Sequence, residues 1–358
     1  MMNVPLPKQK LRLFSSLIAV GNPIVDIIAE VDDQDILNYG LKRGFVNYTD
    51  GDNIGFYEKI EQKLQVLHCP GGSAQNILRA LSWSLPNMDN NQIKLSMLGG
   101  VGDDIFKNKI MSSLKQSKIR TGLLEEIKNS NTSRCAVGTL NGERYFLSDI
   151  LASRSLSQKF CQEKMNEILS HDALLIEGFF IRENSTLCRD ICTAFYNAGK
   201  YIILTLGDTS IIDKFRNEII AIANMADMVV GNLNAAQLLA GVTNGNTKID
   251  DLFIMIHSLL NNIKDRILVV TVGCQGVFCS KYNSATRIEN HFQTFPKRKI
   301  KQNEVVDFNG AGDAFLGGFL SQQMQNKTLE ECCRLGNEVA SIAIRNHGCN
   351  FYINNIRN

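Results

Sequence analysis

The chain has 358 residues, of which 44% are hydrophobic and 21% are charged, and its formal net charge is +2. This composition argues against a disordered chain and against a nucleic-acid partner, since the one dense basic run, Lys297 to Lys301, is typical of a solvated loop. No apolar stretch approaches the roughly 20 residues that span a bilayer, so we expect no membrane partner.

The N-terminal part of the chain predicts β-strands with no long helix between them. The apolar run at 13–20 follows basic residues and faintly resembles a signal peptide, but it leads into Gly21-Asn22-Pro23 without a small-x-small cleavage site. We interpret this run as a first strand. Further strands are predicted at 24–31 and 45–48.

From about residue 94 onward, short apolar runs alternate with segments of helical period. This pattern indicates βαβ units, in which helices cover both faces of a parallel sheet. Strands are predicted at 94–98, 173–177, 201–206, 227–230 and 267–272, and helices at 104–117, 186–198, 312–325 and 329–345. We therefore expect an α/β fold with a central, mostly parallel sheet.

A predicted hairpin interrupts this alternation. Strands at 134–140 and 144–147 flank Asn141-Gly142, a strong turn dipeptide. Together with the N-terminal strands, the hairpin would form a small β-rich lid made of about residues 24–67 and 120–150. The whole chain, 1–358, would then be a single domain that carries a lid.

The cysteines predict no metal centre. None of the ten lies in a Cys-x-x-Cys pair, the close spacing that is typical of a zinc site. Several lie in apolar segments, where a free Cys behaves as a small hydrophobic residue: Cys135, Cys188, Cys192 and Cys279. We expect a reduced, cytoplasmic protein without a structural metal.

The segment most indicative of chemistry is Asn309-Gly310-Ala311-Gly312-Asp313, at a predicted strand-to-helix junction. Backbone N–H groups at such a junction bind anions, aided by the helix dipole. The amides of Gly310, Ala311 and Gly312 could hold phosphoryl oxygens, while Asp313, in the first turn, accepts a proton from an attacking hydroxyl. An ordinary helix cap would account for a Gly-x-Gly-Asp that stood alone.

This segment resembles the C-terminal signature of the ribokinase-like (PfkB) carbohydrate kinases, Asp-Thr-x-Gly-Ala-Gly-Asp, whose last Asp is the catalytic base. The resemblance extends over most of the chain. It implies a ribokinase-like fold, ATP as phosphate donor, Mg²⁺, a small-molecule nucleoside or sugar as acceptor, and Asp313 as the base. Members of the family include monomers and lid-mediated dimers, so the oligomeric state stays open.

Two N-terminal segments, 20–26 and 70–76, resemble the parts of the family that bind the sugar. In the first, the resemblance implies that Asp26 holds two ribose hydroxyls and that Asn22 supports it. In the second, glycines would let the backbone approach the sugar, and a side-chain amide would face the same site. The residues implied are Gly71, Gly72 and Asn76. A helix that begins after a turn would also explain the second segment.

Other segments resemble the phosphate side of the family's site. Gly142-Glu143-Arg144 is similar to the lid position whose Arg reaches the transferred phosphate, a role that suits a planar guanidinium. Segment 270–276 resembles the strand end that lies along ATP. The residues that the resemblance assigns to phosphate or ATP binding are Arg144, Asn232, Thr271, Gly273, Gly276 and Asn309.

The match to the family is incomplete at two positions. Gly231-Asn232 resembles the start of an Asn-x-x-Glu motif that organises magnesium and phosphate, but Ala235 stands where the Glu is expected. Asn232 is then the remaining candidate for an indirect magnesium contact. Phe308 also stands where Thr is usual. A catalytically weak nucleoside- or nucleotide-binding homologue is therefore one alternative.

Several segments are closer to adenosine-phosphorylating members of the family than to its ribose or fructose kinases, notably 21–27, 307–313 and 340–349. Phe179 resembles a Phe that packs against the nucleoside base, and purine faces stack well on rings, although a core Phe would explain it too. In contrast, 204–208 looks more like bacterial sugar kinases. We expect phosphorylation of adenosine to AMP, with a ribose- or fructose-type kinase as the alternative.

Overall fold

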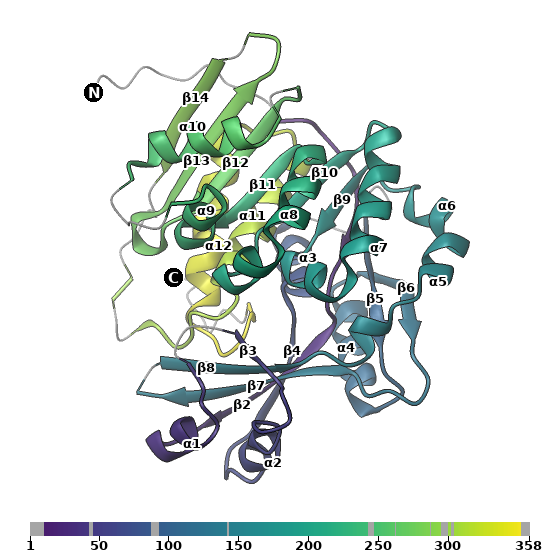
Figure 1. The fold of residues 1–358 in the computed structure, drawn as a ribbon, viewed down its shortest axis with the longest axis vertical. Coiled ribbons are helices and arrows are strands. Elements are labelled where there is room, and N and C mark those ends of the chain that lie inside the picture. The colour runs from purple at the N-terminus through teal and green to yellow at the C-terminus, as the bar shows by residue number, and fades with distance from the viewer. Residues whose placement is uncertain are drawn as a thin grey trace.

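The computed structural model describes residues 11–42, 46–86, 93–141, 143–242, 247–261, 263–286, 288–294, 300–301 and 304–351. Within them the chain forms a nine-stranded sheet covered by helices and a separate five-stranded sheet (Figure 1). Phe45, Gly142 and most of the basic run, Lys297 to Lys299, lie outside the described residues.

The large sheet is mostly parallel, as predicted. Seven neighbouring strands pair in parallel: β12, β11, β10, β9, β1, β5 and β6. Strands β13 and β14 extend the sheet antiparallel at the β12 edge. Across the sheet the order is β14 (Ile288–Thr294), β13 (Val277–Asn283), β12 (Arg266–Thr271), β11 (Met228–Asn232), β10 (Tyr201–Thr205), β9 (Ala173–Ile176), β1 (Ser16–Val20), β5 (Lys94–Val101) and β6 (Arg120–Glu126).

Successive side chains of the central strands enter two different apolar cores, because side-chain direction alternates along a strand. Ile18 and Val20 of β1 face one core, and Leu17 and Ala19 face the other. The first core is closed by α5 (Gln158–Glu163), α6 (Met165–Ile168), α7 (Gly178–Asn197), α8 (Thr209–Met225), α9 (Leu233–Leu239) and α10 (Ile249–Leu259). The second is closed by α3 (Ser73–Ser84), α4 (Ile105–Gln116), α11 (Ala311–Met324) and α12 (Leu329–Ala343).

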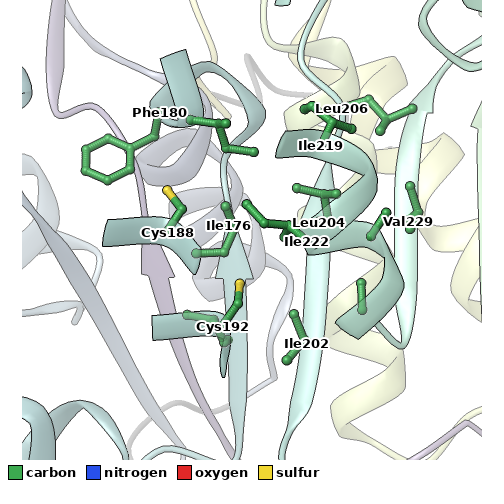
Figure 2. Packing of buried hydrophobic residues seen from close by; sticks show 14 of the residues in the cluster. Ile176, Phe180, Cys188, Cys192, Ile202, Leu204, Leu206, Ile219, Ile222 and Val229 are labelled. Carbon is green, nitrogen blue, oxygen red and sulfur yellow. The ribbon is translucent and has the colours of Figure 1, made fainter. Parts of the chain in front are cut away.

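The interpretation of the apolar cysteines as core residues is confirmed. Figure 2 shows Cys188 and Cys192 of α7 beside Ile176 of β9, in the first core. Cys135 and Cys279 are buried as well. Helix α7 begins eight residues before its predicted start at 186, directly after β9, and a kink at Asn184 (φ −133°) joins its two parts. Phe179 therefore lies in the first turn of a helix.

The small sheet contains the predicted hairpin. Its strand order is β3 (Val46–Tyr48), β8 (Glu143–Asp149), β7 (Ser133–Leu140), β2 (Ile24–Glu30) and β4 (Leu67–Gly71). Strands β7 and β8 pair antiparallel through Leu140 and Glu143, and Asn141 takes the left-handed conformation (φ 51°) that such a turn requires. Helices α1 (Asp33–Asn38) and α2 (Phe56–Glu61) contribute Ile36, Phe56 and Ile60 to its apolar face.

The lid boundaries predicted from the sequence need a correction. The small sheet draws on residues 24–71 and 133–149, whereas strand β6 at 120–126, predicted to be in the lid, pairs in parallel with β5 of the large sheet. A strand that follows a helix completes a βαβ unit, and this pairing prevails over the nearness of β6 in sequence to the hairpin. Among the described residues, no helix is both long enough and apolar enough to cross a bilayer.

Helices α3 and α11 pack against each other at unusually short range. A Cβ atom added to Gly317 of α11 would lie 2.3 Å from the Cβ of Ala80 and 2.7 Å from the backbone nitrogen of Leu81, both in α3. Gly317 thus lets the two helix axes approach. The first turns of the two helices also meet, since Ser73 and Asn76 of α3 donate hydrogen bonds to Asp313 of α11.

Replacement of Gly317 tests this contact. Ala is the better helix former by about 1 kcal/mol, yet we predict that Gly317→Ala lowers the free energy of unfolding by about 1–3 kcal/mol, because the added methyl overpacks a backbone contact. The control is Gly122→Ala in β6, where only the Glu167 carboxylate comes within 4.0 Å of the new Cβ. Chemical denaturation measures both variants. A Gly317→Ala variant as stable as the control would contradict the close packing.

Candidate active site

A cavity of about 680 Å³ opens where strand ends of the large sheet meet the small sheet. Its size is that of a small-molecule site, and its position follows the rule that open α/β sheets bind ligands at the carboxyl ends of their strands. The predicted site residues that line it are Asn22, Asp26, Gly72, Asn76, Arg144, Phe179, Asn232, Asn309, Gly310, Ala311, Gly312 and Asp313. The structure therefore brings most of the predicted set together.

Asp313 lies in the first turn of α11, where two side chains of α3 hold its carboxylate. Ser73 donates from Oγ to Oδ1 at 2.6 Å, and Asn76 donates from Nδ2 to Oδ2 at 3.1 Å. Burial raises the pKa of Asp313 to about 6, an effect that the two hydrogen bonds partly offset. Asp313 is thus oriented and is ionised near neutral pH, as a general base requires.

The loop before Asp313 requires glycine at position 310. Gly310 caps α11 with a left-handed backbone (φ 74°), and an added Cβ would lie 2.6 Å from that of Cys349, so a larger residue fits neither the conformation nor the space. The amide of Ala311 donates to the Phe308 carbonyl at 3.3 Å. Gly310 and Gly312 are therefore the better-placed amides of the three predicted.

Asp26 faces Asp313 across the cavity and is 6% exposed. Burial raises its pKa to about 7, with a further contribution from the charge of Asp307. Gly71, predicted to contact the sugar, does not line the cavity: an added Cβ there would lie 2.3 Å from the Asp26 carboxylate. Gly71 instead makes room for Asp26, while Gly72 (φ 89°) reaches the cavity itself.

Glu177 is a site residue that the sequence did not single out. It follows β9, is 1% exposed and lines the cavity. Its Oε2 accepts from the backbone N–H groups of Asn22 (3.3 Å) and Ala74 (2.9 Å), and its Oε1 accepts from Asn22 Nδ2 (3.2 Å). Burial raises the pKa of Glu177 to about 8 despite these donors. It joins three segments of the site.

Arg144 reaches the cavity from β8 of the small sheet. Its Nε lies 2.5 Å from Oδ1 of Asp307, a buried carboxylate that also accepts from the backbone N–H groups of Asn309 and Gly348 at 2.7 Å each. Nη1 of Arg144 is buried and has no partner within the described part of the chain. The guanidinium is thus held by one edge, and its other edge is available to an anion.

Three residues predicted to bind ATP do not line this cavity: Thr271, Gly273 and Gly276. They lie at the adjoining end of β12, whose Thr271 pairs with Asn232 of β11. Gly273 and Gly276 take positive φ angles (50° and 89°) in the turn that follows. Their position beside Asn232 is compatible with a nucleotide that extends out of the cavity along the edge of the sheet.

The family model described as "pfkB family carbohydrate kinase" matches residues 33–355. The chain belongs to the pfkB family. It is 25% identical over 342 residues to adenosine kinase 2 of Arabidopsis thaliana, with 94% of this chain and 95% of that protein covered. The ribokinase-like fold and the family resemblance noted in the sequence are thereby confirmed.

Solved structures of pfkB-like proteins superpose on nearly the whole chain. Adenosine kinase from Anopheles gambiae, in complex with P1,P4-di(adenosine-5) tetraphosphate, matches with a TM-score of 0.83 at 24% identity, over 95% of this chain and 98% of that one. Adenosine kinase from Schistosoma mansoni, in complex with 2-fluoroadenosine, matches with a TM-score of 0.84 at 19% identity, over 96% and 99%. At sequence identities below 25%, these two comparisons show that the fold is shared.

The pfkB magnesium motif is altered here in a way that the structure explains. Ala235 is fully buried in the first apolar core, where a carboxylate would be desolvated. Asn232 caps α9, with its Oδ1 accepting from the Ala235 amide at 2.9 Å. Within the described residues, no group of three His, Cys, Asp or Glu side chains is placed to hold a metal ion.

The pH dependence of stability tests the burial of Glu177. Its folded-state pKa of about 8 lies above the ordinary value of 4.5, so the folded protein binds this proton more tightly than the unfolded chain does. That contribution is fully present below pH 4.5 and is lost as the pH rises through about 8. We predict that Glu177→Gln, which removes the titrating group, makes the free energy of unfolding fall less over this range.

Chemical denaturation at a series of pH values measures the effect, with the exposed Glu163→Gln of α5 as the control. Gln keeps one acceptor oxygen, for the backbone N–H groups of Asn22 and Ala74, but loses the acceptor for Asn22 Nδ2, so the test compares the pH slopes and not the absolute stabilities. Parallel pH profiles for the wild type and Glu177→Gln would contradict the raised pKa.

Proposed function

We propose that the protein is an ATP-dependent nucleoside kinase that transfers the γ-phosphate of ATP to the 5′-hydroxyl of adenosine and forms AMP. The observation that carries this proposal is the placement of Asp313, beside an anion-binding loop, in the same cavity as Asp26 and Phe179. The adenosine kinases among the similar proteins, two of them with adenosine-containing or adenosine-like ligands, support the choice of acceptor.

In the proposed binding mode, the nucleoside would lie in the cavity with its ribose at Asp26 and its base at Phe179. Asp26 and Asn22 would bind the ribose hydroxyls, and Oδ1 of Asn22 is buried without a partner among the described residues, so it can accept a further hydrogen bond. The base would lie against Phe179, which is partly buried. The 5′-hydroxyl then points toward Asp313 and the Gly310 loop.

In the proposed reaction, Asp313 takes the proton of the 5′-hydroxyl as that oxygen attacks the γ-phosphorus. The bond between the γ-phosphorus and the bridging oxygen breaks, and ADP leaves with the bond electrons. The amides of Gly310 and Gly312, together with the free edge of Arg144, would stabilise the charge on the phosphoryl oxygens. The small sheet would act as a lid, because it supplies Arg144 and covers the cavity from water.

Magnesium would be carried mainly by the phosphates of ATP. Mg²⁺ keeps several waters and is commonly bound by substrate phosphates with one or two protein groups. When bound, the ion neutralises phosphate charge. Asn232, at the cavity edge, is the side chain that would contact its water shell. The ten free cysteines fit a reducing, cytoplasmic location.

Replacement of the base tests the proposal. We predict that Asp313→Asn lowers kcat by a factor of about 100 or more, the usual range for a lost general base, while adenosine binding changes little because Asn can still bond to Ser73 and Asn76. Because the pKa of Asp313 is about 6, the wild-type rate should fall as the pH drops through that value. Steady-state kinetics and calorimetry measure the two effects.

The control is Asp213→Asn, an exposed carboxylate of α8 remote from the cavity lining. A turnover number for Asp313→Asn within about threefold of the wild type would remove Asp313 from the role of base. Loss of a general base usually lowers kcat by a factor of about 100 or more, so a threefold decrease would not be consistent with that role.

A further inference from the structure

We infer that Asp208 selects the base of the substrate by accepting a hydrogen bond from an exocyclic amino group; this inference rests on the proposed function. Asp208 follows β10 and lines the cavity, next to the residues assigned to the base. The sequence pointed to 204–208 only for its similarity to sugar kinases. Nothing in the phosphate-transfer chemistry requires an acid at this position.

The two oxygens of the Asp208 carboxylate have different environments. Oδ1 caps α8: it accepts from the backbone N–H groups of Ser210 (2.9 Å) and Ile211 (3.3 Å) and from the Ser210 hydroxyl (2.6 Å). Oδ2 is shielded from solvent and has no hydrogen-bond partner among the residues that the structure describes. A buried oxygen that lacks a donor costs free energy until a ligand provides one.

The capped oxygen makes Oδ2 a rigid acceptor. Three donors fix the carboxylate plane, so a ligand would not have to order this side chain on binding. Asp208 lies near the proposed position of the base and not near that of the ribose. An added Cβ at Gly207 would lie 3.6 Å from Cδ1 of Phe179, which places the start of the Asp208 loop against the ring on which the base would stack.

The charges around the cavity limit what Oδ2 can bind. Arg144 is the one cationic side chain among the described lining residues, and it is paired with Asp307 on the phosphate side. Arg182 lies over the Tyr48 ring, 3.3 Å from its centroid, and pairs with Glu183. Neither cation pairs with Asp208, so a ligand can supply the donor that Oδ2 lacks. A 6-amino group on a purine stacked on Phe179 provides N–H donors, whereas a base without that group leaves Oδ2 unpaired.

The experiment compares adenosine with purine riboside, which lacks only the 6-amino group, in the wild type and in Asp208→Asn. Asn is as good a helix cap as Asp and keeps Oδ1, but it replaces the free acceptor with a donor. A hydrogen bond to a charged group accounts for a factor on the order of 10 to 100 in kcat/KM. We expect the wild type to prefer adenosine by that factor and Asp208→Asn to lose the preference, with little change for purine riboside.

Asp213→Asn on the same helix is the control and should keep the wild-type ratio. Equal losses for the two nucleosides in Asp208→Asn would assign Asp208 to the helix cap alone and overturn the inference. A wild type that uses adenosine and purine riboside equally would overturn it as well, while leaving the proposed function intact. Phosphorylation of a free sugar but of no nucleoside would reject the proposed function, and the inference with it.

Discussion

The N-terminal turn of α3 holds two desolvated carboxylates, and the rest of the site depends on this arrangement. Ser73 and Asn76 donate to Asp313, while the Ala74 amide between them donates to Glu177. The two bonds to Asp313 join α3 to α11, and these helices pack closely at Gly317. A helix contact in the core thereby helps to set the position of the Asp313 carboxylate at the surface of the cavity.

The cavity is rich in acceptors and poor in cations. Asp26, Glu177, Asp208 and Asp313 line it, and burial raises the pKa of Asp26, Glu177 and Asp313. A neutral ligand with many hydroxyl and amino donors suits such a cavity, and its binding relieves unpaired oxygens. Arg144 is the one cation among the described lining residues and is paired with Asp307, so an acceptor that already carries a phosphate would find no further lining cation there. This distribution of charge favours a nucleoside over a sugar phosphate.

Residues that belong to local motifs could be predicted from the sequence. Asp313, Gly310 and Asn76 each lie at a strand-to-helix or turn-to-helix junction, where the type and order of residues indicate the local geometry. Gly71 was predicted to contact the sugar, but it makes room for Asp26, a neighbour set by the pairing of β2 with β4.

Glu177, Ser73 and Asp208 could not be assigned from the sequence, because their roles depend on which strand ends lie side by side. Glu177 forms part of a segment that was noted only for Phe179, and its three donors come from residues more than 100 positions away. The boundary of the small sheet was misplaced for a similar reason. Strand β6 lies close to the hairpin in sequence, and its pairing with β5 places it in the large sheet.

The central claim is that the cavity accepts a nucleoside rather than a free sugar. The most direct measurement is the ratio of kcat/KM values for ATP-dependent phosphorylation of adenosine, ribose and fructose by the wild-type protein, with the product identified by ³¹P NMR. The base-side contacts at Phe179 and Asp208 predict that adenosine is preferred over both sugars by a factor on the order of 100 or more, and that the product is the 5′-phosphate. A ratio near one, or a preference for ribose or fructose, would contradict the account.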